Sequence, residues 1–258
     1  MIDLGASRVY LNSIATSGAK TFFLGIILTL YRHLIWVLSI LMIAQTQSFA
    51  GQLDLGYDSK YISEGRDNLP EGGIIWTSLN QELNSDFSFV LAYGVATESM
   101  VNYDELNVTI QYAGQTPELS YVVSYTRLEF FADQQSDNEL GLAVEWSNLS
   151  YVTPSVNLVY STEAGGAFLA LGIGQDYAIS DVVNIRPYVS VAFDFGYASK
   201  QFNGHNHSSM GAVLAVQMMK NLVFSFITEH NIGARIVKKE IENNHNQTWA
   251  GAHLTYSY

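Results

Sequence analysis

The sequence contains no cysteine, only 4 prolines and few charged side chains. Without cysteine, the 258 residues can form no disulfide framework, no thiolate metal site and no cysteine nucleophile. So little proline also excludes a proline-rich disordered chain. Charged residues make up 14% of the sequence, whereas an ordinary soluble domain has about a quarter. We infer that something other than water solvates part of the surface.

Basic residues are especially scarce. Lys and Arg together number 12, against 24 Asp and Glu, and the formal net charge is −12. A chain of this charge repels the phosphate backbone, so we expect no nucleic acid partner.

The first fifty residues differ in composition from the rest. Two apolar runs, 21–31 and 34–44, are separated only by Arg32 and His33, and the small-residue site Ser48-Phe49-Ala50 follows. This pattern predicts a signal peptide over 30–50 that is cleaved after Ala50, with 1–29 as an upstream extension and 51–258 as the mature domain. The alternative is one uncleaved transmembrane helix over 21–44, which would bury Arg32 near its middle at a cost of a few kcal/mol.

After residue 50 no apolar run is long enough for a membrane-spanning helix, and the dominant pattern has period two. In 87–96, for example, Phe89, Leu91 and Tyr93 alternate with Val90, Ala92 and Gly94. One face of each segment is apolar, and the other carries mostly Ser, Thr, Asn, Gly and Ala. A soluble β-sandwich or a lipocalin-like fold, the alternative, would place charge on its outer face.

The pattern therefore predicts an all-β fold, a transmembrane antiparallel up-and-down β-barrel of about twelve strands with lipid outside and a polar lumen inside. The expected strands are 52–62, 74–83, 86–97, 103–113, 118–130, 138–147, 154–162, 166–175, 183–196, 208–219, 221–230 and 248–258. Pro187 cannot donate to a β-ladder, so the strand that contains it is expected to begin after it.

The connections between these strands alternate between longer loops and shorter turns, as in barrels of the bacterial outer membrane. With an even number of strands, both termini would lie on the periplasmic side. The alternation of Leu254, Tyr256 and Tyr258 at the C-terminus is typical of the signal read by the barrel-assembly machinery. Expected partners are therefore outer-membrane lipids, this machinery, and small hydrophilic solutes or cations.

A family resemblance rests on the opening motif Gly56-Tyr57-Asp58-Ser59-Lys60-Tyr61, on Gly65-Arg66 and Gly72-Gly73, and on the run from Tyr103 to Tyr125. These segments resemble the TorF-type porin family of Gram-negative outer-membrane β-barrels, most closely over 53–130. That family tends to have Arg-Gly where this chain has Gly65-Arg66. The resemblance implies a pore-like role without a defined substrate.

Strand parity assigns seven acidic and two basic side chains to the lumen: Asp54, Asp58, Lys60, Glu82, Glu105, Glu145, Arg186, Asp194 and Glu229. An acidic lumen favours cations. The sequence thus predicts a narrow porin-like channel for small solutes with a weak cation preference. The alternative is a sealed structural barrel, in which Arg186 and the acids pair across the lumen.

No enzymatic activity and no cofactor are expected. A third reading is an outer-membrane lipid hydrolase that uses His207 and Ser209, but such sites face lipid, and parity places both residues in the lumen. His205, His207, His230 and His245 fall near one rim and could gather a metal ion, although solvated loop histidines are the simpler interpretation.

Overall fold

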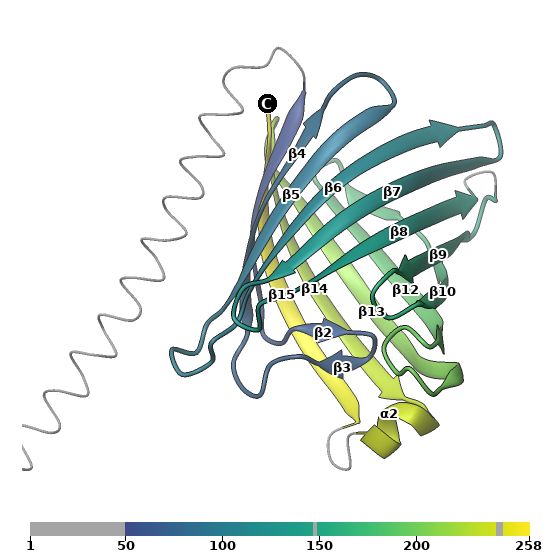
Figure 1. The fold of residues 1–258 in the computed structure, drawn as a ribbon. Coiled ribbons are helices and arrows are strands. Elements are labelled where there is room, and N and C mark those ends of the chain that lie inside the picture. The colour runs from purple at the N-terminus through teal and green to yellow at the C-terminus, as the bar shows by residue number, and fades with distance from the viewer. Residues whose placement is uncertain (1–49, 147–148, 241–244) are drawn as a thin grey trace, which may run out of the picture. The chain divides into compact units, whose positions relative to one another are not determined.

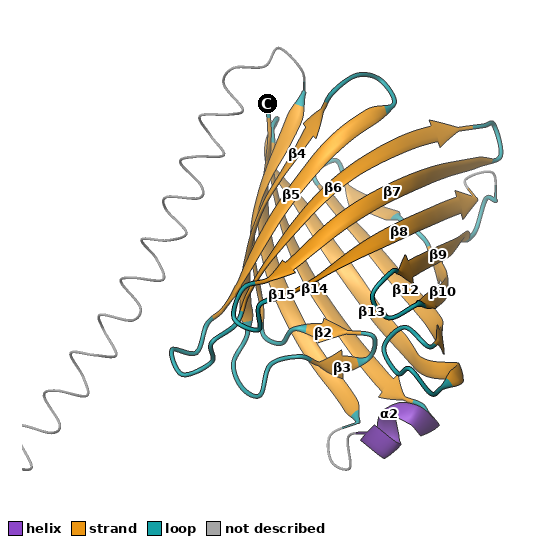
Figure 2. Ribbon diagram, in the orientation of Figure 1, coloured by secondary structure: helices purple, strands orange, loops and turns teal. Residues whose placement is uncertain are grey.

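A computed structural model describes residues 50–146, 149–240 and 245–258, and these residues belong to one compact unit. The predicted upstream extension (1–29) and the predicted signal peptide (30–50), apart from Ala50, lie outside the described residues. Strands dominate the described part of the chain (Figures 1 and 2). The strands of the main sheet are β1 (Gly51–Asp58), β4 (Ile74–Glu82), β5 (Phe87–Ala96), β6 (Asp104–Gln115), β7 (Leu119–Phe130), β8 (Gln135–Trp146), β9 (Thr153–Ser161), β10 (Gly166–Gly174), β11 (Tyr177–Ser180), β12 (Val183–Phe195), β13 (Asn203–Met219), β14 (Leu222–Gly233) and β15 (Asn246–Ser257).

These strands form a closed antiparallel barrel. Apart from β10 and β11, strands that follow one another in the sheet's sequence order pair with each other, and closure comes from β1, which pairs with both β4 and β15. β10 and β11 both pair with β12 and are successive parts of one strand, so the 13 segments make a twelve-stranded barrel. Closure pairs the backbone groups of the edge strands and leaves no open edge. The predicted fold class is confirmed.

The cross-strand register keeps the two kinds of side chain apart. Leu91 of β5 is paired with Leu79 on β4 and Val108 on β6, whereas its neighbour Ala92 is paired with Ser78 and Asn107. The apolar face is the outer one, where large side chains such as Leu140 (55% exposed) and Val189 (53% exposed) have no protein neighbour to cover them. This is the inverted sidedness of a barrel that stands in lipid.

Several predicted strand limits were wrong. β1 ends at Asp58 rather than at residue 62, while β13 begins at Asn203 rather than at 208 and β14 continues to Gly233. The paired segments of β13 and β14 beyond the apolar band are polar, so alternation gave no signal there, although the backbone ladder continues. The segment 176–182, predicted as a turn, contains β11.

The prediction that the strand begins after Pro187 was also wrong. Pro187 lies inside β12, where it is paired with Ala212 of β13. On its other side the eighth strand is interrupted between β10 and β11, and Gln175 there donates its backbone N–H to the Pro187 carbonyl over 3.3 Å. The missing donor of proline thus falls at a break in the ladder, where a strand tolerates it.

The two ends of the barrel differ, as predicted. One end of the barrel, called the turn end below, contains the turns 83–86, 116–118 and 220–221. The start of β1 and the end of β15 lie at the same end. Loops 59–73, 97–103 and 196–202 and the described residues 234–240 lie at the other, called the loop end. The longest loops carry structure of their own: 59–73 contains the short hairpin β2 (Ile62–Ser63) and β3 (Arg66–Asp67), and 234–245 contains helix α2 (Arg235–Glu240). None of the helices described is long and apolar enough to cross a membrane.

Candidate functional site

Hydrogen bonds between strands that are not neighbours identify the inner face of the barrel. The Arg186 guanidinium on β12 donates to Glu145 on β8 over 2.6 Å, and the Tyr188 hydroxyl, also on β12, donates to Glu229 on β14 over 2.6 Å. Side chains on the convex outside of a closed wall diverge, so strands this far apart meet only across the inside. The polar face of the sheet therefore lines the interior.

Where the first and last strands meet, two of the predicted acids share one histidine. Nδ1 of His253 on β15 lies 2.9 Å from Asp54, and its Nε2 lies 3.3 Å from Asp58, both on β1. Thr255 adds a 2.7 Å hydrogen bond to Asp54. These side chains join the chain's two terminal strands inside the barrel.

Arg186 lies between two carboxylates. Besides Glu145 it contacts Asp176 at 3.3 Å, so one positive charge lies between two negative ones. Beside it is a cavity of about 240 Å³, lined by β9, β10 and β12. The polar residues of this lining include Ser155, Asn157, Arg186, Tyr188 and Ser190.

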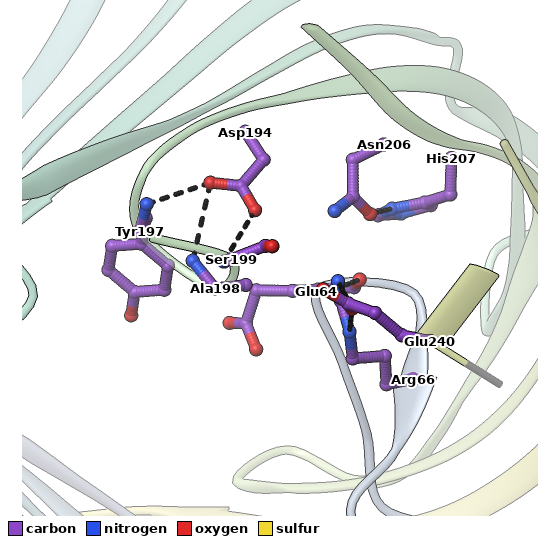
Figure 3. A network of polar contacts seen from close by, with 9 residues as sticks. All are labelled: Glu64, Arg66, Asp194, Tyr197, Ala198, Ser199, Asn206, His207 and Glu240. Carbon is purple, nitrogen blue, oxygen red and sulfur yellow. Dashed lines mark hydrogen bonds and ion pairs between the residues drawn. The ribbon is translucent and has the colours of Figure 1, made fainter. Parts of the chain in front are cut away.

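Two of the remaining predicted acids hold neighbouring loops in place. Asp194 is fully buried and accepts backbone N–H bonds from Tyr197 (2.8 Å), Ala198 (3.3 Å) and Ser199 (2.9 Å), as Figure 3 shows. Glu105 accepts hydrogen bonds from the hydroxyls of Tyr61 (2.7 Å) and Tyr103 (2.5 Å). Both carboxylates already have structural partners, so they differ from freely solvated lumenal charges.

The last three predicted residues have different surroundings. Glu229 accepts hydrogen bonds from Tyr188, from Asn231 (2.8 Å) and from the Trp249 indole (3.2 Å). Lys60 follows the end of β1 and contacts Asp67 at 3.5 Å and Gln247 at 2.5 Å. Glu82 is exposed at the turn end of β4.

The sequence analysis missed the hairpin β2–β3, which lies inside the loop end of the barrel (Figure 1). Its two central residues, Glu64 (φ 47°) and Gly65 (φ 74°), both have the left-handed backbone of a two-residue turn. Gly65 lies directly against β13, because a Cβ placed on it would be 2.7 Å from Nδ1 of His207. The pair Glu64-Gly65 was the available signal, since glycine at the second position favours such turns.

The hairpin is held at its tip by polar contacts with two other elements (Figure 3). Arg66 forms an ion pair with Glu240 on α2, with its Nε 3.0 Å from the carboxylate. Asn206 is fully buried at a bulge in β13. With its amide oriented to satisfy both polar atoms, Asn206 donates to the Glu64 carbonyl (2.8 Å) and accepts from Arg66 (3.2 Å).

The tip also carries an unusual carboxyl group. Burial raises the pKa of Glu64 above its ordinary value, and the negative charges of Glu139 and Glu105 raise it further. A hydrogen bond from Ser63 and the charge of Arg66 act in the opposite direction but do not offset the increase. Docking of the hairpin therefore favours a proton on Glu64.

His207 and Ser209 both lie on the inner face, but in the described structure they do not hydrogen bond to each other. Ser209 pairs with Ser190 over 2.6 Å, and His207 lies beside Asn206. Two other histidines near the rim each have a hydroxyl partner: His205 with Ser208 (3.1 Å) and His230 with Thr248 (2.7 Å). Within 50–146, 149–240 and 245–258 no group of three or more His, Cys, Asp or Glu could hold a metal ion.

Comparison with known proteins identifies the fold. No protein-family model and no curated protein matches the chain. Among solved structures, the KdgM porin is similar with a TM-score of 0.55 and 12% identity, over 80% of this chain and 99% of that one. The NanC porin is similar with a TM-score of 0.50 and 10% identity, over 80% of this chain and 98% of that one. LpxR from Salmonella typhimurium is similar with a TM-score of 0.49 and 10% identity, over 80% of this chain and 99% of that one. The chain has the fold of an outer-membrane β-barrel.

Proposed function

We propose that the mature domain is an outer-membrane channel for small hydrophilic solutes, with a weak preference for cations. The observation that carries the proposal is the polar inner face, on which acidic side chains outnumber basic ones. The porin names of the two solved structures with the highest similarity scores given above support a role of this kind. So does the resemblance of 53–130 to the TorF-type porins.

Free space in the lumen is expected along one side of the wall. Many inward positions of β7 to β10 carry small or short side chains: Ser120, Ser124, Gly141, Ala143, Ser155, Asn157, Ala170 and Gly172. The cavity beside Arg186 lies against this side. A twelve-stranded barrel is intermediate between filled eight-stranded barrels and open porins, so small inward side chains on four strands favour a narrow passage.

The charge of this passage should select the sign of the ion. Because Arg186 offsets only one of its two partners, Glu145 and Asp176, the lumenal carboxylates as a set leave an excess of negative charge. We predict that the protein in planar bilayers under a salt gradient gives a reversal potential of cationic sign. Glu105→Gln combined with Glu145→Gln should move this potential toward the anionic direction.

The matched control is Glu118→Gln, which removes one acid from an exposed turn outside the lumen and should leave the potential unchanged. An unchanged potential in the double variant would contradict a selective role for the lumenal acids.

A sealed structural barrel is the second candidate. The hairpin β2–β3 within the mouth and the paired charges of Arg186 and His253 favour it. A protein that is folded in the bilayer and never conducts, even after the hairpin is removed, would support this candidate against the channel.

Export and membrane residence belong to the same proposal. We infer that the chain is cleaved after Ala50, which would leave β1 intact from Gly51 onward. Lipid would contact the apolar outer face. The barrel-assembly machinery would bind the C-terminal strand, where Leu254 and Tyr256 are exposed on that face and Tyr258 follows.

A further inference from the structure

The hairpin β2–β3 combines a fixed base with a tip held by polar contacts. At the base, Leu69 is buried together with Ile74 and Ala96, and Tyr61 packs against this cluster. The tip makes the contacts described above: Gly65 against His207, Arg66 with Glu240, and Asn206 with the Glu64 carbonyl. These contacts are polar, so a tip that leaves its site can replace them with hydrogen bonds to water. The tip can therefore leave its site while the base stays packed.

Every element around the tip contributes a titratable or charged group. Arg66 belongs to the hairpin itself, Glu105 comes from β6, Glu139 from β8, Tyr197 from the loop after β12, His207 from β13 and Glu240 from α2. The arginine among them, Arg66, is already paired with Glu240. An ionised Glu64 thus lies near two further glutamates, Glu105 and Glu139, and shares the nearby Arg66 with Glu240.

Glu64 also has a strained backbone. A non-glycine residue at φ 47° is uncommon, and such a conformation persists where its surroundings support it. Gly65 favours this turn locally, and the contacts of the docked tip hold Glu64 in it.

We propose that the hairpin β2–β3 is a proton-controlled gate of the loop-end mouth, with the Glu64 carboxyl as its sensor. Protonated Glu64 keeps the tip docked and the mouth narrow. Ionised Glu64 is repelled by Glu105 and Glu139, and the tip swings out. This inference rests on the proposed channel function and adds a form of regulation to it.

The direction of the pH effect follows from linkage. The pKa of Glu64 is higher in the docked hairpin than in a released, solvated one, so the docked form binds the proton more tightly. Docking becomes stronger as the pH falls from the raised pKa of Glu64 in the docked hairpin toward the ordinary pKa of glutamate. Over that range the docked-to-released ratio changes by up to about tenfold per pH unit. Acid closes the mouth, and neutral to alkaline pH opens it.

The contact with α2 does not reverse this effect in the same range. Burial would raise the pKa of Glu240, but hydrogen bonds from Arg66 and Ser199, together with the charge of Arg66, bring it below its ordinary value. Glu240 consequently stays ionised and paired with Arg66 while Glu64 takes up its proton.

The test is the conductance of the protein in planar bilayers at pH 5 and pH 8. Wild type should conduct several-fold more at pH 8. Glu64→Gln, which resembles the protonated side chain, should give the low, closed conductance at both values. Arg66→Ala, which removes the contact with Glu240, should raise the conductance at pH 5. Glu71→Gln is the matched control, because Glu71 is an exposed acid of the same loop, and it should behave as wild type.

A variant in which residues 62–67 are replaced by two glycines distinguishes the gate hypothesis from the channel hypothesis. Heat-modifiable migration on a gel shows that each variant is folded. High conductance of this variant at both pH values supports the gate. Equal conductance of wild type at pH 5 and pH 8, with no change in Glu64→Gln, overturns the gate and leaves the channel standing. If no folded variant conducts, including the one that lacks residues 62–67, both the gate and the channel are overturned.

Discussion

Asp194 shows how one residue can be recognised in the sequence and still have a different role in the structure. Parity assigns it to the lumen, where an acid would attract cations. In the structure it is fully buried, and its two carboxylate oxygens accept three backbone N–H groups of residues 197–199. A buried carboxylate with these partners stabilises a turn of the chain. Asp194 therefore shapes the loop 196–202, which lies beside the hairpin tip in Figure 3.

We predict that Asp194→Ala opens this loop. Three buried donors would lose their acceptor, at a cost of about 1–3 kcal/mol. Trypsin should then cut after the exposed Lys200 faster in the detergent-folded protein, as followed by mass spectrometry. Asp194→Asn keeps one acceptor oxygen and should show a smaller effect, and cleavage after Lys220, at the other end of the barrel, should not change. Equal cleavage rates at Lys200 in all three proteins would contradict the role.

At the scale of a strand, β5 shows both faces of the wall in adjacent residues. Leu91 lies in an apolar row between Leu79 and Val108, and Ala92 lies in a polar row between Ser78 and Asn107. The two positions share a strand, a depth and a backbone environment. They differ only in which side of the barrel they face.

Arginine at these two positions should therefore have different effects. Leu91→Arg places a charge in hydrocarbon, at a cost of roughly 2–4 kcal/mol near the midplane, while Ala92→Arg places it among polar groups of the lumen. Refolding into lipid bilayers, followed by heat-modifiable migration on a gel, should be impaired far more by Leu91→Arg. If both variants refold equally well, or if wild type folds in plain buffer without lipid or detergent, the assignment of the outer face to lipid is wrong.

At the scale of the whole molecule, the barrel depends on the pairing of its two terminal strands. Gly51 and Tyr258 exchange two backbone hydrogen bonds, Gly51 to Tyr258 at 3.2 Å and Tyr258 to Gly51 at 3.0 Å. Further along, His253 joins Asp54 and Asp58 across the same pair of strands. The closing strand thus begins at the first residue after the proposed cleavage site.

We predict that N-terminal sequencing of the protein recovered from the outer membrane begins at Gly51. Replacing Ala50 with the bulky Leu removes the small residue that a signal peptidase requires, so a larger precursor should accumulate. The control is Ala44→Leu, which keeps the apolar run and the cleavage site. Recovery of an intact Met1 in the inner membrane would contradict both the processing and the proposed location.

The sequence by itself determined the class of fold, the number of strands and the sidedness of the wall. Period-two alternation is a local property of a strand, and it reports which side each residue faces without any knowledge of partners. Alternation did not predict the ends of β13 and β14, because these strands continue beyond the apolar band into polar sequence.

Only the tertiary structure decided which groups meet inside the barrel. Arg186 and Glu145 are 41 residues apart, and His253 and Asp54 are 199 apart. Such pairs depend on closure and on the register of every intervening strand, which no local pattern contains. The inward position of the hairpin 62–67 is of the same kind. Its turn could be foreseen from Glu64-Gly65, but its place in the mouth depends on Asn206, His207 and Glu240, which distant strands and α2 bring to it.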